Sequence, residues 1–233
     1  MDITWLGHAA FRVRTGSTAI IMDPFGPDLG LAIPPAQAQA HLVTLSSDAA
    51  FHAATSVVSG EKPPVVFSHP GEYESASVQL RGIRTTRSDG DGNGNGNGNG
   101  DGEAEDKPQA WNTVFVVEAE GIVLCHLGDP DRQLSDRQIE ELGSPHVLLL
   151  PVGSPTGLSA DAAVELVGNV SPRIIVPMLF AHPGNKARLR ELKPFLAELG
   201  EKLPEAQSRL TLTRATLPEE TQLVLLQPAA SML

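Results

Sequence analysis

The chain has 233 residues, of which 41% are hydrophobic, and a formal net charge of −11 at pH 7. This length is enough for one sizeable core, and the acidic balance argues against nucleic acid as a partner, because phosphates attract basic surfaces. No apolar run reaches the roughly 18 residues of a membrane span, and the lone Cys125 cannot form an internal disulfide, so we expect no membrane contact and a cytoplasmic location.

The first half of the chain contains short apolar runs, each four to seven residues long and bounded by turn-forming residues. They predict strands at 3–6, 19–22, 42–45, 65–68, 78–84, 113–118 and 122–127. Between the fifth and sixth of these runs, glycine alternates with Asp and Asn over residues 88–102. Such a sequence buries nothing and loses much backbone entropy on ordering, so we expect one domain over 1–233 with a disordered insert at about 88–110. The start of the insert resembles the calcium-binding loop of an EF-hand. However, Gly100 stands at the position where that loop needs a Glu to bind calcium with both carboxylate oxygens.

The second half alternates predicted strands and helices. Ser135 and Gln138 form a capping box, Ser159 can cap a second helix that runs to about Val170, and Pro194 suits the first turn of a third. Strands are predicted at 146–151, 173–178, 209–213 and 222–226. Strand runs and helices in this arrangement are typical of an α/β sandwich of two sheets with helices outside.

Polar residues stand where several predicted strands end, which is where α/β folds place their sites. His8 follows the first strand and Asp23 the second, while His126 and Asp129 lie at the end of the strand before the capping box. The segment 45–52 is expected to lead from a strand into a helix, where Asp48 supports the loop or caps the helix, and 69–74 is expected to form a tight turn.

Seven motifs resemble the metallo-β-lactamase superfamily, in the bacterial branch related to L-ascorbate-6-phosphate lactonase. They stand in family order at 4–9, 23–25, 70–74, 112–113, 125–129, 148–153 and 172–178. The resemblance covers nearly the whole chain apart from the insert. It implies a four-layer αββα sandwich with two zinc or similar ions between the sheets, which activate a water for hydrolysis.

The resemblance also implies a ligand set that this chain has largely lost. The family signature H-x-H-x-D-H falls on Ser47, Ala49, Phe51 and His52, so only its last histidine remains. The final family histidine falls on Leu179. Alanine, leucine and phenylalanine donate no electron pair and serine is a poor zinc ligand, so we expect no bound metal.

The retained residues are expected to line a partly apolar pocket that has lost its metal ions: His8, Asp23, His52, His126 and Asp129. Without cations, Asp129 is expected to take a histidine partner or to hold a proton. We therefore expect a catalytically impaired or inactive member of the family that binds a small-molecule ligand or a partner.

Two further interpretations stay open. One is a metal-dependent hydrolase of a lactone or phosphate ester, with Zn or Mn held by His52, His126 and Asp129 and supplemented by His182 or Ser47. The other is metal-free hydrolysis with a His126/Asp129 pair as general base.

Overall fold

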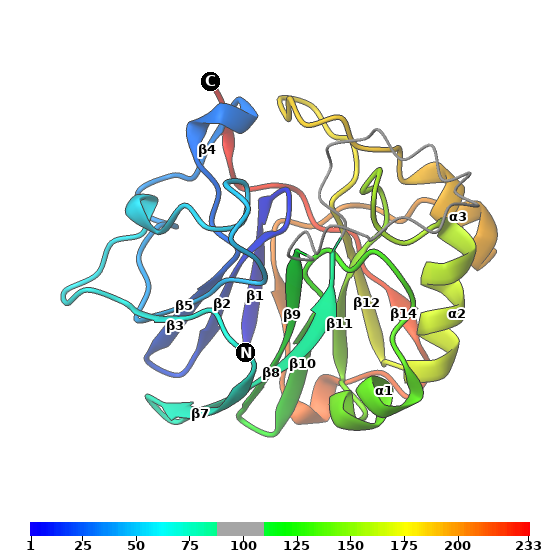
Figure 1. Ribbon diagram of the computed structural model, residues 1–233. Coiled ribbons are helices and arrows are strands. Elements are labelled where there is room, and N and C mark those ends of the chain that lie inside the picture. Colours follow the sequence, from blue (N-terminus) through cyan, green and yellow to red (C-terminus); the bar gives the residue numbers. More distant parts are fainter. Residues whose placement is uncertain (88–109) are drawn as a thin grey trace, which may run out of the picture.

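Two β-sheets packed face to face form the centre of the protein (Figure 1). The computed structural model describes residues 1–87 and 110–233, so the expected disordered insert lies outside the described residues except for its last position. The six-stranded sheet has the order β13-β1-β2-β3-β5-β6. Its strands are β1 (Asp2–Gly7), β2 (Ala10–Thr15), β3 (Thr18–Met22), β5 (Leu42–Thr44), β6 (Val65–Phe67) and β13 (Leu210–Thr211).

The seven-stranded sheet has the order β14-β12-β11-β10-β9-β8-β7. Its strands are β7 (Gly71–Ser75), β8 (Val78–Thr86), β9 (Trp111–Ala119), β10 (Ile122–His126), β11 (Val147–Pro151), β12 (Ile174–Met178) and β14 (Gln222–Leu223). Strands β10, β11, β12 and β14 run parallel, and every residue of β11 and β12 is buried. A parallel strand covered on both faces is continuously apolar, which explains the run at 147–151.

Three α-helices cover the outer face of the seven-stranded sheet (Figure 1). They are α1 (Asp136–Leu142), α2 (Ala160–Val170) and α3 (Lys193–Leu199). The expected capping box of Ser135 and Gln138 begins α1, Ser159 caps α2, and α3 carries its proline in the first turn. The three helices predicted in the second half of the chain are confirmed; side-chain caps satisfy free N–H groups in the first turn of α1 and α2, whereas α3 has no side-chain cap.

Among the described residues, no α-helix covers the outer face of the six-stranded sheet. Leu6 and Ile21 point outward there and pack against Phe25, Leu29 and Leu31 from the segment between β3 and β5. That segment contains a 3-10 turn, η1 (Pro27–Leu29), and the short strand β4 (Leu31–Ala32), which pairs with β15 (Ser231–Met232). The α/β sandwich is thus confirmed, with extended chain and a 3-10 turn as its fourth layer.

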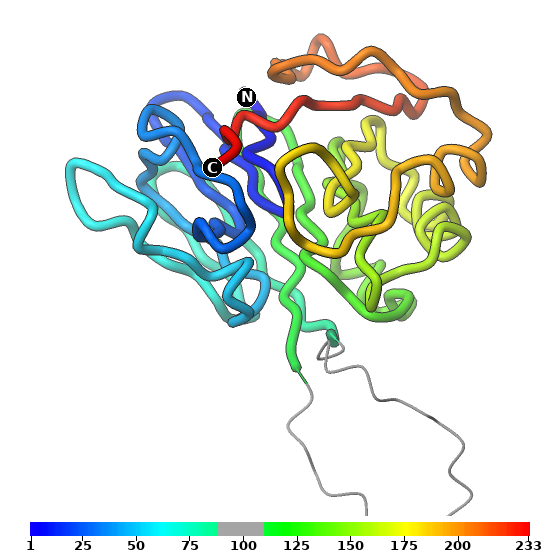
Figure 2. Tube along the Cα trace, turned by 90° about the horizontal axis from the view of Figure 1, so that it is seen from above, coloured from blue at the N-terminus to red at the C-terminus, as the bar shows by residue number. Residues whose placement is uncertain are grey.

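The C-terminal segment links the two halves of the sandwich. After β14 it crosses over the top of the sheets and reaches β4 on the far side (Figure 2). Backbone N–H groups of Ala229 and Ala230 donate to the carbonyls of Trp5 and Leu6 on the way. No helix in the described ranges is long and apolar enough to cross a membrane.

Two local expectations are wrong, and one strand was missed. The segment 48–52 forms turns, followed by the 3-10 turn η2 (Thr55–Val57), so Asp48 caps no α-helix. Part of the expected tight turn at 69–74 is the edge strand β7. Strand β2 was not predicted, although Phe11 and Val13 alternate with Arg12 and Arg14 as a half-buried strand requires.

Candidate functional site

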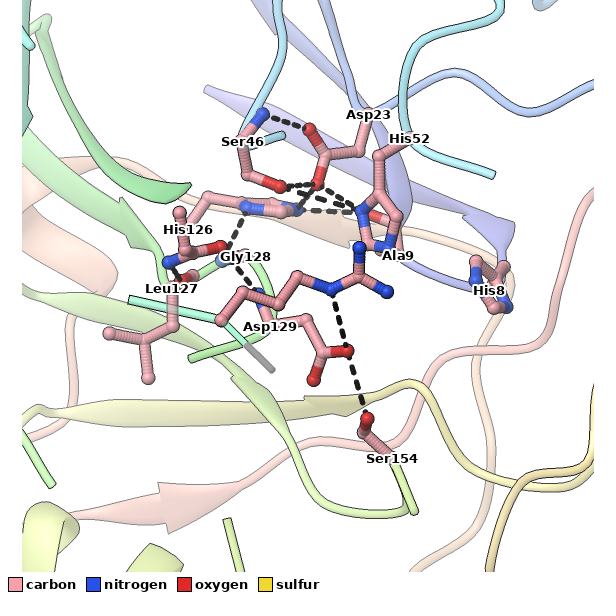
Figure 3. Close-up of polar contacts among 12 residues, drawn as sticks. His8, Ala9, Asp23, Ser46, His52, His126, Leu127, Gly128, Asp129 and Ser154 are labelled. Carbon is pink, nitrogen blue, oxygen red and sulfur yellow. Dashed lines mark hydrogen bonds and ion pairs between the residues drawn. The ribbon is translucent and has the colours of Figure 1, made fainter. Parts of the chain in front are cut away.

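The predicted site residues meet at one end of the sandwich, between the two sheets. Asp23 follows β3, His126 ends β10, and His52 comes from the turn after β5. All three side chains are about 1% exposed. Figure 3 shows Asp23, His52 and His126 pointing toward one another, with Asp129 and Ser154 on the far side of the group.

Asp23 is the centre of this polar cluster. Its Oδ1 accepts the Ser46 backbone N–H at 2.6 Å, and its Oδ2 accepts both the Ser46 hydroxyl and His52 Nδ1, the latter at 2.8 Å. Burial is the largest influence and opposes ionisation of the carboxyl, but the electrostatic attraction of the nearby His126 and His52 rings and the hydrogen bonds from His52 and Ser46 outweigh it and lower the pKa of Asp23. Asp23 is therefore a buried carboxylate whose oxygens are all engaged by the protein.

His126 is held by the main chain on both sides of its ring. Nε2 donates to the carbonyl oxygen of Ala9 at 2.8 Å, and the backbone N–H of Gly128 donates to Nδ1 at 3.0 Å. This fixes the tautomer with the proton on Nε2. Burial lowers the pKa of His126, which agrees with a neutral ring. The ring has no lone pair left to offer a metal ion.

Asp129 has a serine and an arginine as neighbours, which corrects the expectation of a histidine partner. Its Oδ2 accepts the Ser154 hydroxyl at 2.8 Å and lies 3.6 Å from Nε of Arg87. The guanidinium supplies the opposite charge that a buried carboxylate needs in the absence of another cation. Because His126 and Asp129 bond separate partners, they form no general-base pair.

The loop that carries Asp129 is shaped by Gly128 and Asn112. Asn112 donates to the carbonyl of Leu127 at 2.9 Å and accepts the backbone N–H of Asp129 at 2.9 Å. Gly128 has φ +67°, and a Cβ there would overlap Asn112 and Ser46. Only glycine combines this backbone conformation with such close packing.

A cleft of about 520 Å³ opens beside the polar cluster. Three of the five retained residues, His8, His52 and Asp129, line it, as do Phe51 and Leu179 from the lost ligand positions. The His8 ring lies 6.2 Å from the ring of Phe51 and 5.5 Å from that of His52, between centroids. Burial, followed by the neighbouring His52, lowers the pKa of His8 well below its usual value.

Three non-glycine residues at this end of the sandwich have left-handed backbone conformations. They are His8 (φ 53°), Asp23 (φ 46°) and Leu179 (φ 54°). Asp and His tolerate this region better than most residues, whereas a bulky leucine does not. The backbone at position 179 therefore suits the histidine of the family signature better than the leucine it carries.

The residues present do not fit a pair of catalytic metal ions. Within residues 1–87 and 110–233, no three His, Cys, Asp or Glu side chains are arranged to hold a metal. Of the three retained ligand positions, His126 is fully bonded, and only Nε2 of His52 and Oδ1 of Asp129 are buried atoms without a partner. His182 lines no part of the cleft and packs edge-on against Trp5, so it does not replace a lost ligand.

Ser46, Arg87 and Ser154 belong to the site but were not singled out from the sequence. Ser46 stands beside Ser47 in a run of small residues, and nothing local tells which of the two faces Asp23. Ser154 lies in the loop after β11, at the same sheet edge as Asp129, and that position was the available signal. Arg87 stands next to the insert, where a basic residue carries no signal of its own.

Comparison with known proteins shows which relatives this chain has. A family model, the β-lactamase superfamily domain, matches residues 2–179. A metal-dependent hydrolase of the UPF0173 group from Archaeoglobus fulgidus is 28% identical over 193 residues, covering 76% of this chain and 82% of the relative. Another metal-dependent hydrolase of this group, from Methanoculleus marisnigri, is 28% identical over 202 residues. That match covers 83% of this chain and 87% of the relative.

A solved structure extends the likeness to three dimensions. A protein from Thermotoga maritima, described as a Zn-dependent hydrolase of the metallo-β-lactamase superfamily, is 30% identical. The superposition covers 97% of this chain and 98% of the Thermotoga maritima chain, with a TM-score of 0.72. The sequence motifs, the two-sheet sandwich and these matches agree, and the chain belongs to the metallo-β-lactamase superfamily of metal-dependent hydrolases.

Proposed function

We propose that this protein is a member of the superfamily that no longer hydrolyses substrates with metal ions and instead binds a small organic ligand in its cleft. The observation that carries the proposal is the state of His126, whose two ring nitrogens are both bonded to the main chain. To ligate a metal, the ring must give up at least one buried hydrogen bond and leave a main-chain group unsatisfied, at a cost of about 1–3 kcal/mol.

The replaced positions support the same proposal. A fully liganded structural zinc site contributes roughly 10–16 kcal/mol, and most of that is lost when three or four ligands fall to two. Phe51 and Leu179 turn former ligand positions into an apolar wall. Arg87 beside Asp129 supplies positive charge where the family pattern places a cation.

The alternative is a hydrolase with a reduced, single-metal site. It is favoured by the relatives described as metal-dependent hydrolases and by the two unpartnered atoms, Nε2 of His52 and Oδ1 of Asp129. These two atoms supply half of the four donors that zinc usually takes from protein and water. Two more ligands must come from His126, Ser47 or solvent.

Metal analysis of the purified protein decides between the two. The chain is produced in medium supplemented with Zn²⁺ and with Mn²⁺, dialysed against metal-free buffer, and its metal content measured by mass spectrometry. We expect far less than one ion per chain under both conditions. About one tightly held ion per chain would overturn the proposed function in favour of the reduced-site hydrolase.

A further inference from the structure

The cleft combines cations with apolar walls, in a chain whose net charge is strongly negative. Three basic side chains line it, Arg87, Lys186 and Arg188, against two acidic ones, Asp28 and Asp129. With histidines neutral, the lining carries a net charge of 3 − 2 = +1, whereas the whole chain carries −11. This local reversal of sign favours an anionic ligand.

The cations keep most of their hydrogen-bonding capacity for a ligand. Arg87 lies 3.6 Å from Asp129, beyond hydrogen-bond distance, and its side chain donates to no described residue. Lys186 and Arg188 form no side-chain hydrogen bond or ion pair within the described part of the chain. A guanidinium with free donors in a fork geometry matches a carboxylate.

His52 adds a buried acceptor to the same cleft. Its Nδ1 donates to the carboxylate of Asp23, so in the neutral ring Nε2 carries a lone pair. Nε2 is buried without a hydrogen-bond partner, although the residue lines the cleft. A buried acceptor destabilises the protein while it is unpaired, so a ligand that brings a hydroxyl hydrogen gains from pairing with it.

Most of the remaining wall residues are apolar. Phe51, Leu179 and Leu189 line the cleft, and Phe51 is 44% exposed although it is a large aromatic residue. Exposed apolar area next to a few polar groups is typical of small-molecule sites.

We propose that the cleft binds a small hydroxy acid with an apolar tail. Arg87 receives the carboxylate, His52 Nε2 accepts the hydroxyl hydrogen, and the tail packs on Phe51, Leu179 and Leu189. The assignment rests on the proposed metal-free function, because a cation between Asp129 and His52 would occupy the place of the head group.

The test is calorimetric titration of the metal-stripped full chain with 3-hydroxyoctanoate and three probes that each lack one feature. Octanoate lacks the hydroxyl, octane-1,3-diol lacks the carboxylate, and 3-hydroxybutyrate lacks most of the tail. We expect 3-hydroxyoctanoate to bind most tightly. Loss of the carboxylate or of the tail should each weaken binding by about tenfold or more, and loss of the hydroxyl by about fivefold.

Single-residue variants test which side chain binds which part of the ligand. Arg87→Gln should weaken 3-hydroxyoctanoate about tenfold and weaken the diol much less, because the diol has no carboxylate for Arg87 to bind. The matched control is Arg137→Gln on α1, because this arginine pairs with the exposed Glu141 and with no other described residue, and it lies outside the cleft. Phe51→Ser should weaken the long-tailed acids and leave 3-hydroxybutyrate unaffected.

The outcomes separate this inference from the proposed function. If the diol binds as tightly as the acid, if Arg87→Gln has no effect, or if no probe binds, the hydroxy-acid assignment is wrong while the metal-free proposal stands. If binding appears only after Zn²⁺ is added, the proposed metal-free function fails as well.

Discussion

Replacing Asp23 by alanine is expected to lower the free energy of unfolding by about 3–5 kcal/mol. The substitution leaves a buried imidazole, a hydroxyl and a backbone N–H without their common acceptor, since Ser46 and His52 both bond this carboxylate. It also places alanine at φ 46°, where an L residue without a short polar side chain is strained. Urea denaturation followed by circular dichroism measures the change.

Asp23→Asn is the matched variant, because asparagine keeps the shape and tolerates the left-handed backbone. It should lose less stability than Asp23→Ala, and its stability should depend less on pH. The pKa of Asp23 is lowered in the folded state, so its contribution is present above the unfolded value of about 3.9 and is lost as pH falls through the folded pKa. If Asp23→Asn showed the same acid dependence as the wild type below pH of about 4, another carboxyl would be responsible.

Restoring the four replaced ligands of the family is expected to give the protein a zinc-binding site. The quadruple variant carries Ser47→His, Ala49→His, Phe51→Asp and Leu179→His. With His52, His126 and Asp129 it again has two sets of donors, and histidine suits the left-handed backbone at 179. We expect zinc to bind with a dissociation constant below about 1 µM, against no measurable binding by the wild type.

The control for this experiment is the same quadruple variant with Asp129→Asn, which removes a carboxylate expected to share both ions. Its zinc affinity should fall by about tenfold or more. Calorimetric titration with Zn²⁺ measures both proteins after circular dichroism has shown that they fold. A well-folded quadruple variant that stays metal-free would show that the four positions were assigned wrongly.

Much of the fold could be predicted from the sequence because its signals are local. The capping box at Ser135, the serine before α2 and the proline of α3 act within one helical turn. The apolar runs of β11 and β12 follow from burial on both faces. Helix formation after β5 was predicted wrongly because Asp48 followed by two alanines has helical propensity that the surrounding turns override.

Five residues of the pocket were expected from the sequence, whereas Ser46, Arg87 and Ser154 and the hydrogen bonds of the whole group were not. His8, Asp23, His52, His126 and Asp129 do gather at one end of the sandwich, as their positions at strand ends indicated. Which partner each takes depends on chain segments far apart in sequence. Arg87 reaches Asp129 across 42 positions and Ala9 reaches His126 across 117, and no local pattern encodes either contact.

The central claim is that too few electron-pair donors converge in this cleft to hold a divalent ion. Crystals grown with excess Zn²⁺ and measured at the zinc absorption edge test it most directly. We expect no anomalous peak in the cleft, with His126 Nε2 still bonded to the Ala9 carbonyl and Arg87 still beside Asp129. An anomalous peak surrounded by four or more N or O atoms at about 2.0–2.2 Å would contradict the claim.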